Sequence, residues 1–350
     1  MSNAPDRPGY RVWTAILRTA LRYAAMAMLA FLLFGFILLI SGKDPIQSYR
    51  DIFVSTLGSA YGFSEVIVAM TPLLLTALAV ALPSRLGLIN VGGEGQLYMG
   101  ACLATWAALT FGALPPWLVL PIMVVLGMLG GAVWAWIPGQ LRARGIVNET
   151  ITTLLLNAVA PMIVSFFIFG YWHSPMDTNK TSIFSSSARL PTLFHTRVDL
   201  SLFLGLALLG LFWFIMRYTR WGLEMRAIGG NPQAARLNGI PTRGYVVVVM
   251  YLAGAVAGLA GMAQVSGYYG VLLANFSRGL GYMGFLISWL AGGSPLGIVV
   301  TSFVVAIILT GGNLLQLTRD LPYSMINILL AMTLFVVLAR PSLSRRRKAT

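Results

Sequence analysis

The sequence predicts an all-α, polytopic membrane protein with about ten transmembrane helices. Of its 350 residues, 57% are hydrophobic and 10% are charged, and the mean hydropathy is +0.80. Soluble domains carry about 25% charged residues, so this composition does not fit a soluble fold. Apolar runs recur along the chain at about twenty residues each, the length that a helix needs to cross a bilayer.

The chain divides into a basic N-terminus (1–22), a transmembrane region (23–339) and a basic tail (340–350). The expected spans are 23–40, 64–82, a third that ends near 111, 118–137, 149–170, 200–216, 245–266, 283–291, 296–310 and 323–339. A short surface helix is expected near 45–56. The first span resembles a signal peptide at its start, but no small-residue cleavage pattern follows it, so it is expected to remain in the protein.

The distribution of positive charge predicts the orientation. Of the 24 basic residues, 17 lie in segments assigned to one side of the membrane. By the positive-inside rule, both termini and the polar interval 217–244 are expected in the cytoplasm, with the loop 171–199 outside. The formal net charge of +14 is explained by this topology, and we expect no nucleic-acid partner.

The sequence carries no recognisable catalytic or metal-binding motif. It has no G-x-x-x-x-G-K-[ST] sequence to hold nucleotide phosphates and no H-E-x-x-H sequence. Cys102 is the only cysteine, and His173 and His195 share one loop without ligand spacing. We therefore expect no catalytic residues, no metal site and no cofactor in this chain, and interpret it as a non-enzyme.

A glycine-rich stretch, 87–100, contains the first group of candidate polar residues, Asn90, Glu94 and Gln96. Glycine interrupts regular helix, and irregular backbone at membrane depth is tolerated only where protein buries it or water lines it. One interpretation is a broken element that faces a translocation path. The alternative is an ordinary cytoplasmic turn in which Glu94 is solvated.

A second group, Thr150, Thr153 and Asn157, lies at spacings of three and four on one face of the span 149–170. This stripe either lines a path or makes interhelical hydrogen bonds. Asn148 is expected to cap this helix. A further break at 292–295 lies in the second half of the chain, so the two interrupted segments suggest two pseudo-repeated halves with broken helices near the centre.

The interval 217–244 contains a short helix with clear end signals. Asn231 is expected as N-cap, Pro232 occupies the first helical position, and Gly239 can adopt the left-handed conformation that closes the helix. A helix of about two turns is unstable alone in water, so something must hold it. It either packs on its own membrane domain or docks into a groove on a partner.

Three motifs, GLINVGGEGQLYMGA, VNETITTLLLN and AIGGNPQAARLNGI, occur in this order. They closely resemble those of permease subunits of bacterial ABC importers, in the branched-chain amino acid and monosaccharide permease superfamily. The match is nearest to the nucleoside and simple-sugar branch, and it covers about 49–339.

The resemblance implies that the helix 231–238 is a coupling helix docked on a separate ATP-binding ABC subunit, which holds the ATP and Mg. The implied coupling residues are Gly229, Gly230, Asn231, Pro232, Ala234, Ala235, Arg236 and Gly239. A second homologous permease, forming a heterodimer, and an extracytoplasmic substrate-binding lipoprotein complete the expected complex in the lipid of the bacterial inner membrane. The loop 171–199 is the candidate contact with the binding protein.

Nucleosides are the leading candidate solutes, followed by simple sugars and then branched-chain amino acids. A different class, an ion-coupled secondary transporter of small polar solutes, stays open as the alternative. Such carriers place ionisable residues within their spans, which are scarce here. ATP dependence and resistance to a protonophore distinguish the two classes.

Overall fold

The computed structural model describes residues 28, 32–40, 42–174, 177–193, 196–319, 328 and 331. Helices dominate these residues, which confirms the all-α prediction. The helices are α2 (Pro45–Leu57), α3 (Ala60–Ser84), α4 (Gly93–Phe111), α5 (Pro116–Ala143), α6 (Glu149–Gly170), α7 (Ser201–Tyr218), α8 (Arg220–Gly230), α9 (Pro232–Leu237), α10 (Thr242–Ala263), α11 (Leu280–Leu290) and α12 (Pro295–Arg319). A π-helical turn, Gln264–Tyr269, extends α10.

Six helices within the described residues are long and apolar enough to cross a membrane. They are α3, α5, α6, α7, α10 with its π-helical extension, and α12 over Pro295–Gln316. Helix α11 is apolar but shorter. The first expected span is described, as helix, over 32–40, and the last, 323–339, lies almost wholly outside the described residues. The chain is therefore a multi-pass helical protein, while the count of ten spans stays a prediction.

Several boundaries differ from those expected. Helix α12 continues to Arg319 instead of ending near 310, because Gly311 stays helical and faces Ile52: a Cβ added there would lie 2.5 Å from Ile52 Cγ2. The interval 217–244 contains an unexpected helix, α8, in front of the expected α9. The segment 267–282, expected as loop, is helical at both ends.

The chain forms two compact units, residues 1–59 with 307–350 and residues 60–306. The second unit contains the candidate site, and its core is a glycine seam between α5 and α10. A Cβ on Gly131 would lie 2.1 Å from the Gly254 carbonyl oxygen, and one on Gly258 would lie 2.2 Å from that of Gly127. Both helices thus carry a Gly-x-x-x-Gly pair that brings the backbones together.

Helix α4 packs into the same seam, so that three helices share one contact region. A Cβ on Gly100 would lie 2.2 Å from Gly258 Cα, and one on Gly261 would lie 2.1 Å from the Leu97 carbonyl oxygen. No side chain fits between these backbones. The centre of the unit is therefore held by direct backbone packing.

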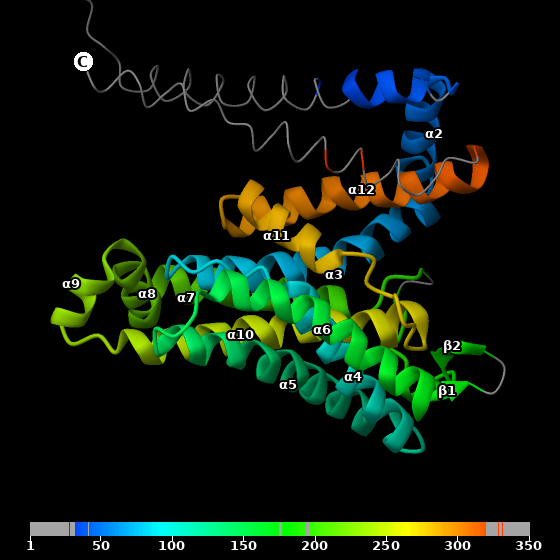
Figure 1. Cartoon of the computed structure of the whole chain (residues 1–350). Helices are drawn as coiled ribbons and strands as arrows, with labels where there is room; N and C mark the ends of the chain where they lie inside the picture. The colour runs from blue at the N-terminus through cyan, green and yellow to red at the C-terminus, as the bar shows by residue number, and fades with distance from the viewer. Residues whose placement is uncertain are drawn as a thin grey trace, which may run out of the picture. The chain divides into compact units, whose positions relative to one another are not determined.

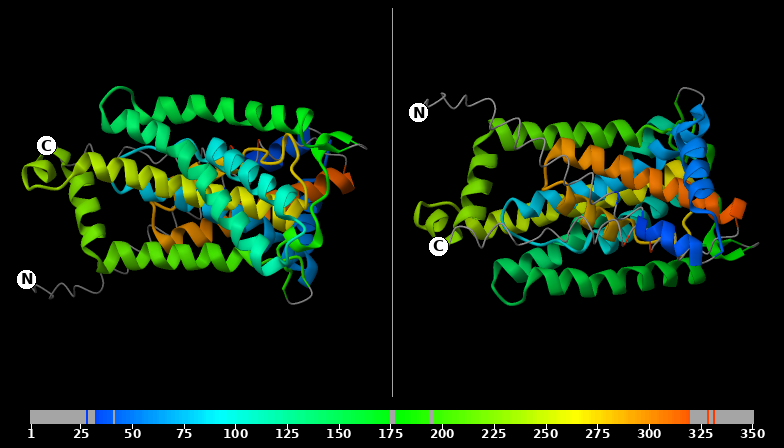
Figure 2. Two further views of the ribbon diagram at one scale, coloured as in Figure 1. Left: turned by 90° about the horizontal axis from the view of Figure 1, so that it is seen from below. Right: turned by 90° about the horizontal axis from the view of Figure 1, so that it is seen from above.

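Helices α6 and α7 flank this centre on opposite sides (Figure 2). Only 28% and 22% of their apolar windows are buried within the chain, compared with 89% for α3. Their remaining apolar surface is available to lipid or to another membrane subunit.

The two ends of the unit differ in structure (Figure 1). One end carries α8 and α9. The opposite end carries a hairpin of β1 (His173–Ser174) and β2 (Asp177–Thr181), which pair antiparallel. The loop around this hairpin is bonded to the segment after α10, since Thr181 N donates to Leu272 O at 3.0 Å and Phe184 N donates to Gly270 O at 2.9 Å.

Candidate functional site

Two helix starts from distant parts of the sequence meet inside the second unit. Helix α4 begins at Gly93, after the α3–α4 loop (85–92), and α11 begins at Leu280. A Cβ added to Gly281 would lie 2.1 Å from the Glu94 nitrogen, so only glycine permits this approach. We call the surrounding group of Asn90, Glu94, Gln96 and Asn157, with Gly279 and Gly281, the polar junction.

Glu94 joins the two helix starts. Its carboxylate accepts hydrogen bonds from the Gly281 N–H at 2.7 Å and from the Gly279 N–H at 3.2 Å. Those groups belong to the first turn of α11, where N–H groups lack helical partners and the helix dipole favours a negative charge. Glu94 is only 5% exposed. It is therefore a buried cap of α11, and the solvated-turn interpretation is wrong.

Asn90 and Gln96 form a reciprocal pair of amides. Gln96 Nε2 donates to Asn90 Oδ1 at 3.0 Å, and Asn90 Nδ2 donates to Gln96 Oε1 at 3.2 Å. Asn90 Oδ1 also accepts the Gly92 N–H at 3.0 Å. Both side chains are buried, so their hydrogen-bonding groups are satisfied by each other and by the α3–α4 loop.

Asn157 of α6 fixes the start of α4. Its Oδ1 accepts the Gly95 N–H at 2.8 Å, and its Nδ2 donates to Val91 O at 2.9 Å. Asn157 and Glu94 thus have the same role. Each side chain accepts a hydrogen bond from a backbone N–H at the start of another helix, α4 for Asn157 and α11 for Glu94. This interhelical bonding is the second of the two roles that the sequence left open for the stripe on α6.

The other two candidates on α6 lie beside the junction. Thr153 is buried and donates its hydroxyl to the Thr150 carbonyl oxygen at 3.1 Å, and a Cβ on Gly92 would lie 3.0 Å from Thr153 Cβ. Thr150 is half-buried in the first turn of the helix. The N-cap expected at Asn148 is confirmed by its bond from the Thr150 N–H at 2.8 Å. Thr153 therefore packs on the α3–α4 loop, and the Thr150 carbonyl oxygen accepts its hydroxyl hydrogen bond.

Glu149, the first residue of α6, also belongs to this site. Its Oε1 accepts the Ile89 N–H at 3.2 Å, and its Oε2 lies 3.0 Å from Arg142 Nε. Glu149 is 4% exposed. It therefore ties the α5–α6 connection to the α3–α4 loop. Its adjacency to Asn148 was the available sequence signal, but its partner Ile89 is 60 residues away.

The expected short helix is confirmed as α9, with the expected caps. Asn231 Oδ1 accepts the N–H groups of Gln233 and Ala234, both at 3.0 Å, and Gly239 has φ +80°. Ala235 is buried, whereas Leu237 is 89% exposed. Helix α9 therefore packs on its own chain through one face and presents an apolar side chain on another.

The implied coupling residues have different surroundings. Gly229 touches the α3–α4 loop, since a Cβ there would lie 2.2 Å from the Arg85 carbonyl oxygen, while Gly230 has open space. The exposed members are Gly229, Gly230, Asn231, Pro232, Ala234, Arg236 and Gly239. In Figure 2, α8 lies across the ends of α7 and α10, at one end of the unit.

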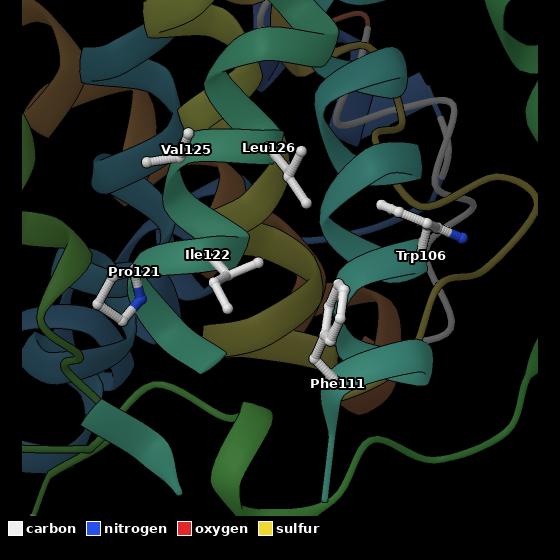
Figure 3. Close-up of a pocket in the computed structure, with 6 residues that line it drawn as sticks. All are labelled: Trp106, Phe111, Pro121, Ile122, Val125 and Leu126. Atoms are coloured by element: carbon white, nitrogen blue, oxygen red, sulfur yellow. The ribbon is translucent and has the colours of Figure 1, made fainter. Parts of the chain in front are cut away.

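An apolar pocket lies away from the polar junction, between α4 and α5 (Figure 3). Trp106 and Phe111 come from α4, and Pro121, Ile122, Val125 and Leu126 come from α5. These side chains are almost entirely hydrocarbon, so the pocket offers little hydrogen bonding to a polar solute. The described residues also contain no group of three His, Cys, Asp or Glu side chains that could hold a metal ion.

An apolar helical bundle whose centre is interrupted by helix starts and a buried polar network has the architecture of a membrane transport protein. A family model described as "Branched-chain amino acid transport system / permease component" matches residues 62–338. The chain therefore belongs to this family of ABC transporter permeases, as the motifs predicted.

Individual relatives agree over most of their lengths. The glucose ABC transporter permease protein TsgB13 of Haloferax volcanii is 33% identical, over 92% of this chain and 88% of the relative. The nucleoside permease NupB of Lactococcus lactis subsp. cremoris is 33% identical, over 88% and 87%. The guanosine permease NupP of Bacillus subtilis is 30% identical, over 86% and 88%.

A solved structure shares the fold. PsaBC from Streptococcus pneumoniae, in complex with Fab, superposes with a TM-score of 0.52 at 13% identity, covering 86% of this chain and 99% of that one. This likeness shows the fold alone. Together with the family, it makes the chain a multi-pass permease subunit of an ABC transporter.

Proposed function

We propose that this chain forms the translocation path for nucleosides or simple sugars in an ATP-driven importer. The observation that carries the proposal is α9, a capped six-residue helix with an 89% exposed leucine, held at one end of an apolar bundle. The sequence contains no nucleotide-binding motif of its own. A permease without this motif needs a separate ATPase, and an exposed helix of this kind is a surface on which one can dock.

The complex would contain an ATP-binding ABC subunit seated on α9, which would bind the ATP and Mg. A second, homologous permease would complete the path as a heterodimer, and lipid or that subunit would cover the apolar faces of α6 and α7. An extracytoplasmic lipoprotein would deliver the solute against the loop 171–199, which contains the β1–β2 hairpin. The names of TsgB13, NupB and NupP support a nucleoside or sugar as the solute.

The path would run beside the polar junction, because broken helices expose backbone groups to a polar solute at such points. In the structure described above, the junction side chains are bonded to backbone within the chain. Their role in transport would therefore be to hold the helix starts that border the path, with Thr150 at its edge. Opening of the junction would be needed for direct contact with the solute.

Solute uptake by the assembled complex tests the function. Proteoliposomes containing this permease, its companion permease, the ATPase and the binding protein should accumulate a labelled nucleoside or glucose only with enclosed ATP. Labelled leucine serves as the comparison solute. Uptake that persists without the ATPase and stops with a protonophore would instead indicate an ion-coupled secondary transporter.

Coupling through α9 can be tested separately. Arg236→Glu reverses a charge on the exposed side of α9, and Gly239→Val forces a β-branched residue into φ +80°. We expect both variants to insert normally but to lose ATPase pull-down and uptake. Arg144→Glu, an exposed charge reversal at the end of α5, is the matched control. Normal ATPase association in both α9 variants would show that this helix only packs on its own chain.

The proposed location is the bacterial inner membrane with both termini in the cytoplasm. Single cysteines at Ser186, which is exposed in the loop 171–199 after β2, and at Ser344, outside the described residues, test this in a Cys102→Ala background. An impermeant maleimide added to intact cells should label position 186 and not position 344. Labelling of position 344 from outside would overturn the topology.

A further inference from the structure

Helix α11 is held near both ends by the first residue of the α3–α4 loop, Arg85, and by Glu94 just after that loop. At its start, Glu94 accepts hydrogen bonds from Gly279 and Gly281. At its end, the Arg85 Nη2 atom donates to the Gly293 carbonyl oxygen at 2.5 Å. Two side chains only nine positions apart in the sequence therefore form hydrogen bonds near opposite ends of one helix.

The charges of these two residues suit the ends that they hold. A helix carries partial positive charge at its N-terminus, which Glu94 faces, and partial negative charge at its C-terminus, which Arg85 faces. Gly292 and Gly293 have φ +59° and +66°, and the Gly293 N–H donates to Ser288 O at 3.0 Å, so α11 ends in a tight left-handed turn. Arg85 binds the carbonyl group that this turn presents.

The middle of α11 rests on α3. A Cβ on Gly284 would lie 2.2 Å from Thr76 Oγ1, which donates to Pro72 O of its own helix at 2.8 Å and lies 3.3 Å from Leu280 O. Helix α11 has eleven residues and is therefore about 16 Å long. Its two close contacts, at Gly281 and Gly284, both lie in its first half, so the helix can tilt about them while its far end moves.

The α3–α4 loop also touches α8, which precedes the proposed coupling helix α9. Gly229 of α8 packs directly against the Arg85 carbonyl oxygen, and a Cβ on Gly87 would lie 3.9 Å from Gly229 O. Burial, and secondly the positive charge of Arg226 on α8, lower the pKa of the Arg85 guanidinium. The Arg85 guanidinium carbon also lies 5.5 Å from the centre of the Phe212 ring of α7. The loop thus lies between α8 on one side and α11 on the other.

We propose that the α3–α4 loop transmits movement of α8 to α11, with Arg85 as the positioning residue at one end and Glu94 at the other. Displacement of α8 by the ATPase would push the loop through Gly229, and the loop would tilt α11 against α3. Helix α11 would be the element that opens and closes the path. This inference rests on the proposed ATP-driven function.

A cysteine introduced by Tyr282→Cys reports on α11 movement, since Tyr282 lies in its first turn and is 41% exposed. In a Cys102→Ala background, the reconstituted transporter is labelled with maleimide either without nucleotide or with ATP and vanadate. We expect the labelling rate to differ severalfold between these states when α8, the loop and α11 are intact.

The decisive variant is Gly229→Ala, because its new methyl group would overlap the Arg85 carbonyl oxygen. The difference in labelling between nucleotide states should disappear and uptake should fall by about tenfold or more, while the ATPase remains bound. Gly244→Ala is the matched control, since Gly244 lies at the same end of the unit with no atom within 4 Å of an added Cβ. It should leave both measurements unchanged.

Arg85→Met repeats the test from the loop side and should also abolish the difference in labelling between nucleotide states. Arg85→Lys should retain part of that difference, because a lysine still has a hydrogen-bond donor. A purely structural role would lower the amount of protein and leave the nucleotide-dependent labelling of the remainder intact, which would overturn the proposal. Labelling that is independent of nucleotide in a parent complex with ATP-driven uptake would also overturn it. A parent complex without ATP-driven uptake would overturn the proposed function and this inference together.

Discussion

The glycine seam and the polar junction both hold helices together, but hydrogen-bonded side chains contribute only in the junction. In the seam, α4, α5 and α10 meet backbone to backbone, with Gly131 and Gly254 leaving no room for a side chain. In the junction, α4, α6 and α11 meet through the buried side chains of Glu94, Asn157 and Gln96, which are bonded to backbone or to another side chain. The seam depends on shape alone, whereas the junction adds buried hydrogen bonds to one close backbone contact, that of Gly281 with Glu94.

This difference indicates which part of the molecule can move. Close-packed backbones resist displacement, since any shift creates overlap or an empty space. A hydrogen bond can be exchanged for one to water or to a polar solute at low net cost. We therefore expect the seam to be the fixed part of the permease and the hydrogen-bonded contacts of the junction to be the part that can open.

The largest expected effect comes from filling the seam. Gly131→Ala places a methyl group 2.1 Å from the Gly254 carbonyl oxygen, so the two helices must separate. Overpacking against backbone should destabilise the protein by about 3 kcal/mol or more. The measurements are the amount of permease in the membrane and the aggregation temperature of the purified protein.

The control for this variant is Gly210→Ala in α7, where an added Cβ meets no atom within 4 Å. It should accumulate like the parent. Equal stability of the two variants would mean that the seam is not the rigid centre of the unit.

Intermediate effects are expected from Glu94. Glu94→Ala leaves the N–H groups of Gly279 and the buried Gly281 unpaired, at a cost of about 1–3 kcal/mol, and uptake should fall roughly five- to 150-fold with protein levels near normal. Glu94→Gln should fall between this variant and the parent. An amide has one acceptor oxygen for the two donors, Gly279 and Gly281. Initial rates of labelled solute uptake measure both.

A contradiction would be a Glu94→Ala permease that transports like the parent. In that case the cap on α11 would have no part in transport, whatever it does for stability. Full uptake by Glu94→Gln would show that one acceptor is sufficient and that the negative charge has no role.

The smallest effects are expected from the neutral amide pair. Gln96→Ala removes one partner, while Asn90→Ala also frees the Gly92 N–H, so uptake should fall more in the second variant. Because both changes break the same pair, the double variant should cost little more than Asn90→Ala alone. If the losses of uptake in the two single variants add up in the double variant, the two side chains act independently.

The sequence predicted features whose physical cause lies nearby in the chain. The caps of α9 followed from Asn231, Pro232 and Gly239, because capping bonds span two or three residues. The start of α6 at Asn148 was predicted for the same reason. The two groups of candidate path residues lie in or beside the polar junction, while their role in a path stays a prediction.

The sequence did not predict what these residues contact. Glu94 binds Gly279 and Gly281, which lie 185 and 187 positions away, and no local pattern encodes that pairing. Helix α8 was missed because its mixed polar composition resembles a loop. The Gly-x-x-x-Gly pairs of α5 and α10 were visible in the sequence, but their pairing depends on the packing of distant helices.

The separation between Glu94 and its partners also sets an order of synthesis. A ribosome adding about 5–20 residues per second needs roughly 10–40 s to reach Gly281 after Glu94 has been made. An unpaired carboxylate is too costly to bury in hydrocarbon during that interval, so the nascent segment must wait at the aqueous surface until α11 is inserted. Stalled chains that end before Gly279 should therefore leave a cysteine introduced by Leu97→Cys, with Glu94 intact, open to water-soluble reagents, whereas complete chains, in which position 97 is buried, should protect it.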